Sequence, residues 1–419
     1  MKSKINSRTV LKALKLLVLF VVVGMVVTIV VRSWDRGEPI TEFLQVEGCQ
    51  DVLETMLKGR WVGRPHTQQE LDGVQRWIHL SRMEHSIPAT LQRTDSLCGN
   101  VTFNELIGRM NPLMWFRAMC DPNGPVPCCY HNVCSSRSVE DCRCQGCYDM
   151  RQPIHAELST WVPSDPTCKI RPFDRASTAC QLLHNMTIYM LGDSLVRHLY
   201  ISLLTILRQG KVYGALKEEA NVGVLEMCDP DFILLFRCMG WVDGDTWECN
   251  NTVRLKFLEH SRADASKYNL EQAGQLIGKP NTLLFIGIGI HNDYNASLVI
   301  NEVLTPLIKH LSSSPWPKLV WSASHAPGIM KTPRVPAQSR ESVLAFNNQL
   351  RPVLDAHKVP VFDTFQLTDG VMSFDGVHFG RGVNDVKAQI FLNYVHQLRS
   401  KGDTPVKGAL NATIVPHIS

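Results

Sequence analysis

After residue 180 the chain alternates short apolar runs with longer amphipathic stretches. The runs are rich in β-branched and aromatic residues, as strands are, and occupy residues 187–191, 232–237, 282–288, 318–322 and 359–362. Between them, apolar residues recur with helical periodicity over residues 196–207, 297–311, 341–357 and 384–399. Strands separated by helices of this length predict β-α units and a parallel sheet. We therefore expect an α/β domain over residues 181–400.

An uncharged apolar run at residues 16–31, extended by neighbouring apolar residues, reaches about the 20 residues that a spanning helix needs. Five basic residues precede its core, which predicts a cytoplasmic tail over residues 1–15 and a luminal location for everything after residue 31. A cleaved signal peptide is the alternative, but no small-residue cleavage site follows the run. The pattern favours a signal-anchor and a single-pass type II membrane protein, with a short polar stem over residues 32–48.

The chain beyond the anchor suits a secretory compartment. Five N-x-S/T glycosylation acceptors lie there, at Asn100, Asn185, Asn250, Asn295 and Asn411. The narrow apolar run favours the thinner membrane of the Golgi, with another secretory membrane or the plasma membrane as the alternative. Residues 1–36 carry a charge of +6 within a total of +4, so the main body is nearly neutral and lacks the basic surface of a nucleic-acid binder.

Residues 49–180 contain 11 of the 14 cysteines and show little periodicity. In an oxidising lumen an even number of cysteines predicts a disulfide framework, here around a loop-rich region. A more specific alternative is a zinc cluster at Cys142, Cys144 and Cys147, because the spacing of these cysteines suits a metal site. We favour disulfides and predict no metal site.

Polar clusters follow two predicted strands and precede the last helix. Gly192-Asp193-Ser194 follows the strand at 187–191, and a segment containing Gly289, His291 and Asn292 follows the strand at 282–288. The third cluster, Asp375-x-x-His378, lies before the last helix. Ligands of a parallel α/β sheet bind beyond the carboxyl ends of its strands, so we expect these clusters to meet there.

Serine needs a base within hydrogen-bond reach, and that base needs a third group to orient it. We predict Ser194 as nucleophile, His378 as base and Asp375 as the group that holds the imidazole. The alternatives are a helix N-cap for Ser194 and an ordinary turn before the last helix for the other two. Asp193 is predicted to be a cap or supporting acceptor rather than a catalytic group.

These motifs resemble the SGNH/GDSL superfamily. Gly-Asp-Ser-Leu-Val-Arg at 192–197 and Asp-Gly-Val-His-Phe at 375–379 resemble its PC-esterase branch, which includes plant trichome-birefringence-like O-acetyltransferases and the animal sialate O-acetyltransferase. The resemblance spans residues 161–400, and Gly-Arg-Trp-Val at 59–62 is similar to the N-terminal segment of the plant proteins. One departure is Phe379, where the plant proteins have tryptophan.

The resemblance implies a three-layer α/β/α fold and acyl transfer through an acyl-serine, usually onto sugar hydroxyls in the Golgi lumen. It makes Gly289, His291 and Asn292 candidates for the oxyanion hole or for acceptor binding. A further oxyanion glycine is left open among Gly214, Gly223 and Gly240. Arg197 either faces the site, binding an acyl carbonyl or a carboxylated sugar, or pairs with an acid. For His325 we favour a structural role.

The leading hypothesis is a luminal serine-dependent O-acyltransferase that moves acetyl groups onto glycan or polysaccharide hydroxyls. The alternatives are a carbohydrate acetylesterase with the same triad and an inactive glycan-binding ectodomain. We expect no tightly bound cofactor. Acetyl-CoA is made mainly in the cytosol, so the acetyl donor is either acetyl-CoA itself or a multi-span membrane partner that delivers the acetyl group. Residues 401–419 are predicted to be a C-terminal tail.

Overall fold

The computed structural model describes residues 49–84, 90–103, 116–209, 214–228, 236–260, 262–263 and 266–401. The predicted cytoplasmic tail, anchor and stem lie outside these ranges, as does the C-terminal tail after residue 401. Among the residues that are described, no helix combines the length and apolar character needed to cross a bilayer.

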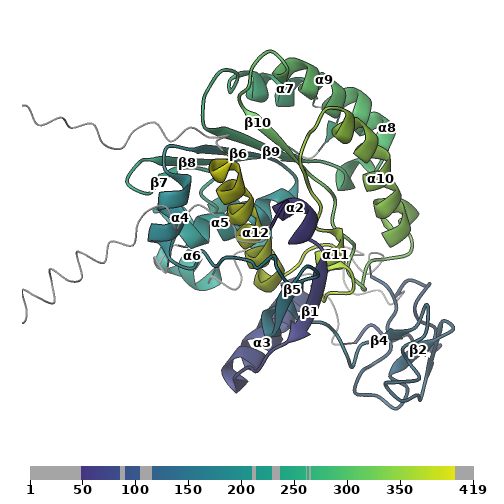
Figure 1. Ribbon diagram of the computed structural model, residues 1–419. Coiled ribbons are helices and arrows are strands. Elements are labelled where there is room, and N and C mark those ends of the chain that lie inside the picture. The colour runs from purple at the N-terminus through teal and green to yellow at the C-terminus, as the bar shows by residue number, and fades with distance from the viewer. Residues whose placement is uncertain are drawn as a thin grey trace, which may run out of the picture. The chain divides into compact units, whose positions relative to one another are not determined.

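A six-stranded sheet forms the centre of the fold (Figure 1). Its order is β11-β10-β9-β6-β8-β7, and all neighbours are parallel except β7 and β8. The strands are β6 (Thr187–Gly192), β7 (Asp245–Glu248), β8 (Val253–Glu259), β9 (Thr282–Gly287), β10 (Lys318–Ser322) and β11 (Val361–Phe362). The predicted parallel sheet is thereby confirmed.

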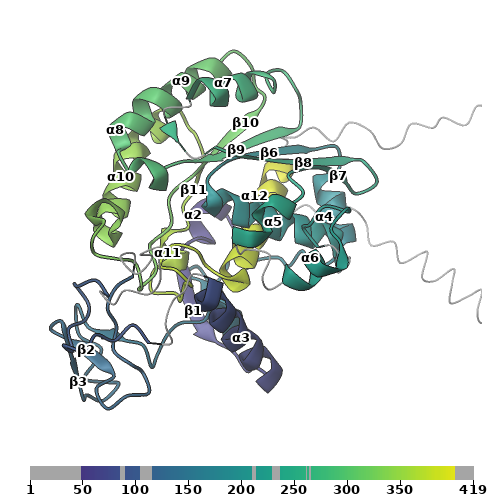
Figure 2. The same cartoon turned by 180° about the vertical axis from the view of Figure 1, so that it is seen from behind.

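Alternate residues of the strands enter two separate cores. In β6, Ile188 and Met190 join one apolar cluster, whereas Tyr189 and Leu191 join the other. Helices that supply the first cluster are α2 (Val52–Thr55), α4 (Ala176–Leu183), α5 (Ser194–Arg208) and α12 (Arg381–Ser400). Those that supply the second are α7 (Ser266–Gly274), α8 (Ala296–Val299), α9 (Thr305–Leu311) and α10 (Arg340–Ala356). Helices thus cover both faces, and the three-layer α/β/α arrangement is confirmed (Figures 1 and 2).

One predicted strand is wrong where the structure describes it. Of residues 232–237, the described part belongs to the 3₁₀ helix η4 (Phe236–Trp241), and Cys238 of that helix is disulfide-bonded to Cys228. The place beside β6 is taken by β8, in which Val253, Leu255 and Phe257 alternate with charged residues and point into the first core. The predicted helix at 297–311 comprises α8, a π-helical turn η7 (Ile300–Leu304) and α9.

Part of the N-terminal region packs into the sheet's own core. Strand β1 (Gly59–Gly63) pairs antiparallel with β5 (Ser159–Pro163), and the buried Trp161 donates its indole N–H to the carbonyl of Met56 at 2.7 Å. A longer helix, α3 (Gln68–Glu84), follows β1. The remaining short helices are η3 (Ala156–Leu158), α6 (Val222–Met227), η6 (Ile290–Asn292), η8 (Pro336–Gln338) and α11 (Phe365–Thr368).

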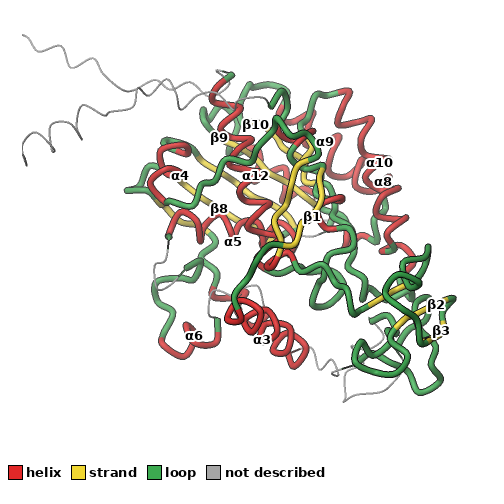
Figure 3. The backbone as a smooth tube through the Cα atoms, turned by 60° about the horizontal axis from the view of Figure 1, so that its bottom comes forward, coloured by secondary structure: helices red, strands yellow, loops and turns green. Residues whose placement is uncertain are grey.

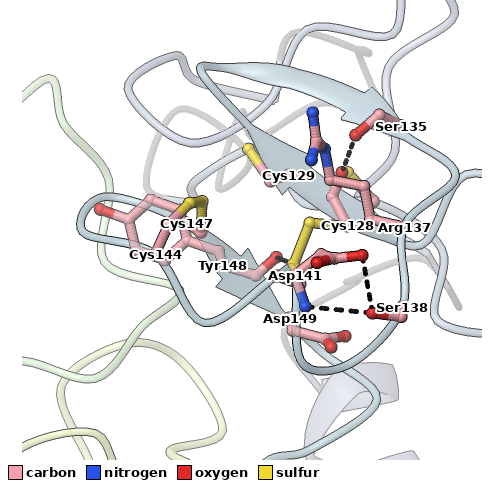
Figure 4. Close-up of a disulfide and its surroundings, with 12 residues drawn as sticks. Cys128, Cys129, Ser135, Arg137, Ser138, Asp141, Cys144, Cys147, Tyr148 and Asp149 are labelled. Carbon is pink, nitrogen blue, oxygen red and sulfur yellow. Dashed lines mark hydrogen bonds between the residues drawn. A yellow bond between two sulfur atoms is a disulfide. The ribbon is translucent and has the colours of Figure 1, made fainter.

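The disulfide framework is confirmed, and the zinc alternative is wrong. Seven disulfides pair all 14 cysteines: 49–168, 98–129, 120–134, 128–142, 144–147, 180–249 and 228–238. Cys142, Cys144 and Cys147 have no free thiolate for a metal. Their region contains only the short strands β2 (Cys128–Tyr130), β3 (Val133–Ser135) and β4 (Tyr148–Asp149) and is otherwise mostly loop (Figures 3 and 4).

Four of the five predicted glycosylation acceptors fall within the described residues. These are Asn100, Asn185, Asn250 and Asn295, and all four are exposed. Asn185 is accessible even though it lies only two residues before the buried strand β6, and it occupies a turn with a positive φ of 59°. The fold therefore leaves each of these asparagines open to modification.

Candidate active site

Strands β6 and β9 bring two of the predicted clusters together. Gly192, the last residue of β6, is the register partner of Gly287, the last residue of β9. The two backbones approach so closely that a Cβ on Gly192 would lie 2.4 Å from the carbonyl oxygen of Gly287. The segments that follow these glycines therefore leave the same edge of the sheet side by side, as the prediction for parallel strands requires.

Asp193, rather than Ser194, caps helix α5. The Asp193 carboxylate accepts the N–H of Leu195 at 2.9 Å, and Ser194 is the first helical residue. Burial raises the pKa of Asp193, while the backbone N–H of Leu195 opposes that shift. The N-cap alternative for Ser194 is wrong, and its half-buried hydroxyl is left to interact across the site.

The hydroxyl of Ser194 lies within hydrogen-bond distance of the predicted base. Ser194 Oγ is 2.6 Å from Nε2 of His378, and Nδ1 of the same ring is 2.6 Å from Asp375 Oδ2. These three residues come from the start of α5 and from the turn before α12, and Ser194 and His378 are 184 residues apart in the sequence. The structure therefore joins the two motifs in one hydrogen-bonded chain.

The ionisation of Asp375 fixes the direction of these hydrogen bonds. Burial would raise its pKa, but the neighbouring His378 and the backbone N–H groups of His378 and Val377 outweigh burial and lower the pKa to about 2. Asp375 is therefore ionised at neutral pH and accepts the Nδ1–H of His378. In the neutral form of the ring, Nε2 then carries no proton and can accept the hydroxyl proton of Ser194, which is the arrangement a general base needs.

Backbone hydrogen bonds hold the turn that carries Asp375 and His378. Asp375 Oδ1 accepts the N–H groups of Val377 and His378, at 2.9 and 2.7 Å, and the N–H of Phe374 donates to the carbonyl of His378 at 3.2 Å. Gly376 has a φ of +85°, and a Cβ there would lie 2.6 Å from the backbone nitrogen of Lys331. A glycine is thus needed both for the turn and for its contact with the neighbouring loop.

Aromatic side chains surround the imidazole of His378, and the sequence analysis did not identify them. The Phe374 ring stacks on it with centroids 5.6 Å apart, and Trp77 of α3 meets Phe374 edge-on at 5.5 Å. On another side lies His198 of α5, 5.0 Å from His378 between centroids. Burial lowers the pKa of His198 well below its ordinary value, so a neutral ring lies beside the proposed base.

Arg197 pairs with an acid, one of the two predicted alternatives. Its guanidinium lies 2.7 Å from Glu259 Oε1 and 3.0 Å from the sulfur of Met239, and the side chain is 7% exposed. Because these partners already use one end of the buried guanidinium, we treat Arg197 as a packing and pairing residue rather than a substrate ligand.

An Arg197→Met variant is expected to keep the catalytic rate within about threefold of wild type, since the link between Ser194 and His378 does not involve the guanidinium. Its free energy of unfolding should fall by roughly 1–3 kcal/mol because a charged hydrogen bond is lost. Urea denaturation and the rate of ester cleavage measure the two effects. A hundredfold loss of rate at unchanged stability would show that Arg197 contacts substrate.

The predicted oxyanion candidates lie just beyond β9. Gly289 precedes η6, and His291 and Asn292 lie within it, with His291 exposed. Asn292 Oδ1 accepts the N–H of Ala263 at 3.1 Å, which holds this loop in place. Their role in binding an oxyanion or an acceptor stays a prediction.

Of the three glycines left open as the further oxyanion donor, Gly240 has the position that best suits this prediction. It belongs to η4, whose Met239 contacts Arg197 one turn after Ser194. Gly223 lies inside the short helix α6, and Gly214 follows α5 at a φ of +49°. The element that carries Gly240 thus has a contact near the start of α5.

No protein-family model matches the chain, and no curated protein matches its sequence. Several solved structures resemble part of the chain at low sequence identity and low TM-score. Three of them are a lipolytic G-D-S-L family member from Veillonella parvula (16% identity, TM-score 0.30, 50% of this chain and 97% of that one), a lipase/acylhydrolase from Enterococcus faecalis (17%, 0.32, 54% and 100%) and the inhibitor-bound aryl esterase of M. smegmatis (17%, 0.27, 51% and 99%).

Proposed function

We propose that this chain is a luminal serine-dependent O-acyltransferase that moves acetyl groups onto glycan or polysaccharide hydroxyls. The observation that carries the proposal is the hydrogen-bonded chain from Ser194 through His378 to Asp375, with both links at 2.6 Å. A hydroxyl, a base and an ionised carboxylate in this order are the components of nucleophilic acyl transfer.

The proposed reaction has two half-reactions. Ser194 Oγ attacks the acetyl carbonyl carbon while His378 Nε2 takes the hydroxyl proton, and the departing group then takes that proton from His378 as acetyl-Ser194 forms. In the second half, His378 removes the proton of a sugar hydroxyl, whose oxygen attacks the acetyl carbon. The ester forms, and the proton returns to Ser194. Asp375 stays ionised and stabilises the imidazolium in both halves.

Support for transfer rather than hydrolysis comes from the motifs around the triad. Gly-Asp-Ser-Leu-Val-Arg at 192–197 and Asp-Gly-Val-His-Phe at 375–379 resemble the PC-esterase branch, in which sugar O-acetylation is the usual reaction. Hydrolysis uses the same three residues with water as acceptor, so the identity of the acceptor is what the experiment must decide.

The proposal includes a location and a donor. A Golgi type II topology places the site in the lumen, where glycans are available, and the seven disulfides suit that compartment. The acetyl group comes from acetyl-CoA directly or through a multi-span partner. Acetylation of glycan by the purified full chain with acetyl-CoA alone would remove the need for such a partner.

The test supplies the full chain with 4-nitrophenyl acetate, with and without a panel of oligosaccharides. We expect an acceptor sugar to accelerate nitrophenolate release, and mass spectrometry to detect the acetylated sugar. Acetate released at the same rate with and without every sugar would instead identify an esterase. A folded chain that neither cleaves the ester nor reacts with a fluorophosphonate would be a binding protein.

A further inference from the structure

Two buried polar side chains outside the triad form a hydrogen-bonded pair next to the catalytic turn. Lys387 of α12 and His325, in the loop after β10, are 4% and 5% exposed, and Lys387 Nζ lies 3.0 Å from His325 Nδ1. The other ring nitrogen, His325 Nε2, lies 2.8 Å from the carbonyl oxygen of Val377. A carbonyl only accepts, so Nε2 carries the proton and Nδ1 accepts from Lys387.

Val377 stands between the two triad residues of the turn, and its peptide group is held from both sides. The carbonyl of the Val377–His378 peptide accepts from His325, and the N–H of the same peptide donates to Asp375 Oδ1 at 2.7 Å. Rotation of this peptide would carry the Cα of His378 and its ring with it. The hydrogen bond from His325 thus ties this peptide to a residue outside the turn.

We propose that Lys387 and His325 are positioning residues, which fix the Val377–His378 peptide and so hold the His378 imidazole in line with Ser194. The inference rests on the proposed function, because it concerns the rate of the same acyl-transfer step. Within the described part of the chain, the side-chain hydrogen bonds of Lys387 and His325 join the two residues to each other and to the Val377 carbonyl, so neither is assigned a proton transfer.

The surroundings keep His325 in the required form. Burial lowers its pKa well below the ordinary value, and the nearby Lys387 lowers it further, so the ring stays neutral. The Phe379 ring meets it edge-on, 5.0 Å away between centroids. Burial also lowers the pKa of Lys387 to about 7, against the opposing charge of Asp193. Lys387 donates a hydrogen bond to Nδ1 in either protonation state, because an amine and an ammonium both carry N–H groups.

The test compares His325→Leu, His325→Gln and Lys387→Met in the full chain. The readout is the second-order rate of fluorophosphonate labelling, together with kcat and KM for 4-nitrophenyl acetate, measured well below each variant's unfolding temperature. We expect His325→Leu to label about 100-fold more slowly, because a misplacement near 1 Å can cost that much. Its kcat should fall while KM changes little. The labelling rate of Lys387→Met should fall about tenfold, since His325 remains but its Nδ1 loses the donor that helps to hold the ring in place.

A glutamine amide can donate to the Val377 carbonyl and accept from Lys387 as the imidazole does. The labelling rate of His325→Gln should therefore recover to within about tenfold of wild type. His396→Leu is the matched control: it removes another buried histidine, nine residues beyond Lys387 on α12 and thus about 13 Å along the helix. It should lower stability without slowing labelling. Equal labelling rates in wild type and in folded His325→Leu would overturn the inference, as would a His325→Gln variant as slow as His325→Leu. An unlabelled wild type would overturn the proposed function itself.

Discussion

Replacing Ser194 with alanine is expected to abolish covalent labelling by fluorophosphonates and to reduce ester cleavage by about 10⁶-fold, the loss seen when a triad serine is removed. The physical reason is that the acyl-enzyme route needs the Oγ atom, which lies 2.6 Å from His378 Nε2. Little structural cost should follow, because Asp193 and not Ser194 caps α5. Labelling followed by mass spectrometry of the modified peptide measures the effect.

The matched control for this variant is Ser202→Ala, the same change two turns further along α5. Ser202 is buried, and its hydroxyl donates to Asp385 at 2.9 Å, away from His378. We expect this variant to be less stable by about 1 kcal/mol and to label at the wild-type rate. If Ser194→Ala still labels, or if both serine variants lose labelling alike, Ser194 is not the nucleophile.

The parallel sheet can be predicted from the sequence because its central strands are buried on both faces. Strand β9 (Thr282–Gly287) is buried throughout, so it reads as a continuous apolar run bounded by polar residues. Strand β8 has Arg254 and Lys256 between its buried residues and therefore lacks such a run. Its apolar and charged residues nevertheless alternate with the period of two that is typical of a strand. Residues 236–237, the described end of the predicted strand at 232–237, belong to a 3₁₀ helix, so apolar content without alternation mispredicts a strand there.

The meeting of Ser194, His378 and Asp375 can be predicted because these residues lie in two short motifs that the sequence places at the same edge of the sheet. His325 and Lys387 show the limit of that approach. A lysine on the buried face of α12, in line with Phe391 and Tyr394, is an anomaly that the sequence shows. Its partner does not follow, since His325 is 62 residues away and only the folded chain brings the two side chains together. For the same reason, the sequence left open whether Arg197 faces the site or pairs with an acid.

An Asp375→Asn variant is expected to lose about 10⁴-fold in kcat while keeping its fold, the effect that this substitution has in serine triads. The asparagine carbonyl oxygen can still accept the N–H groups of Val377 and His378, which bond Asp375 Oδ1 in the wild type. Its amide N–H₂ then faces His378 Nδ1 in place of Oδ2. A nitrogen that meets a donor must accept, so the ring proton moves to Nε2, and His378 can no longer take the proton of Ser194.

Asp369→Asn provides the matched control, because it makes the same change six residues earlier in the chain. Asp369 pairs with Arg340 on the exposed face of α10, so its loss should leave kcat within about twofold, as exposed ion pairs contribute little. Single-turnover kinetics with 4-nitrophenyl acetate separate acylation from later steps and compare the two variants directly. A loss below tenfold in Asp375→Asn would mean that the tautomer of His378 is set by something other than this carboxylate. The ring orientation with Nδ1–H donated to Asp375 and Nε2 facing Ser194 would then be wrong.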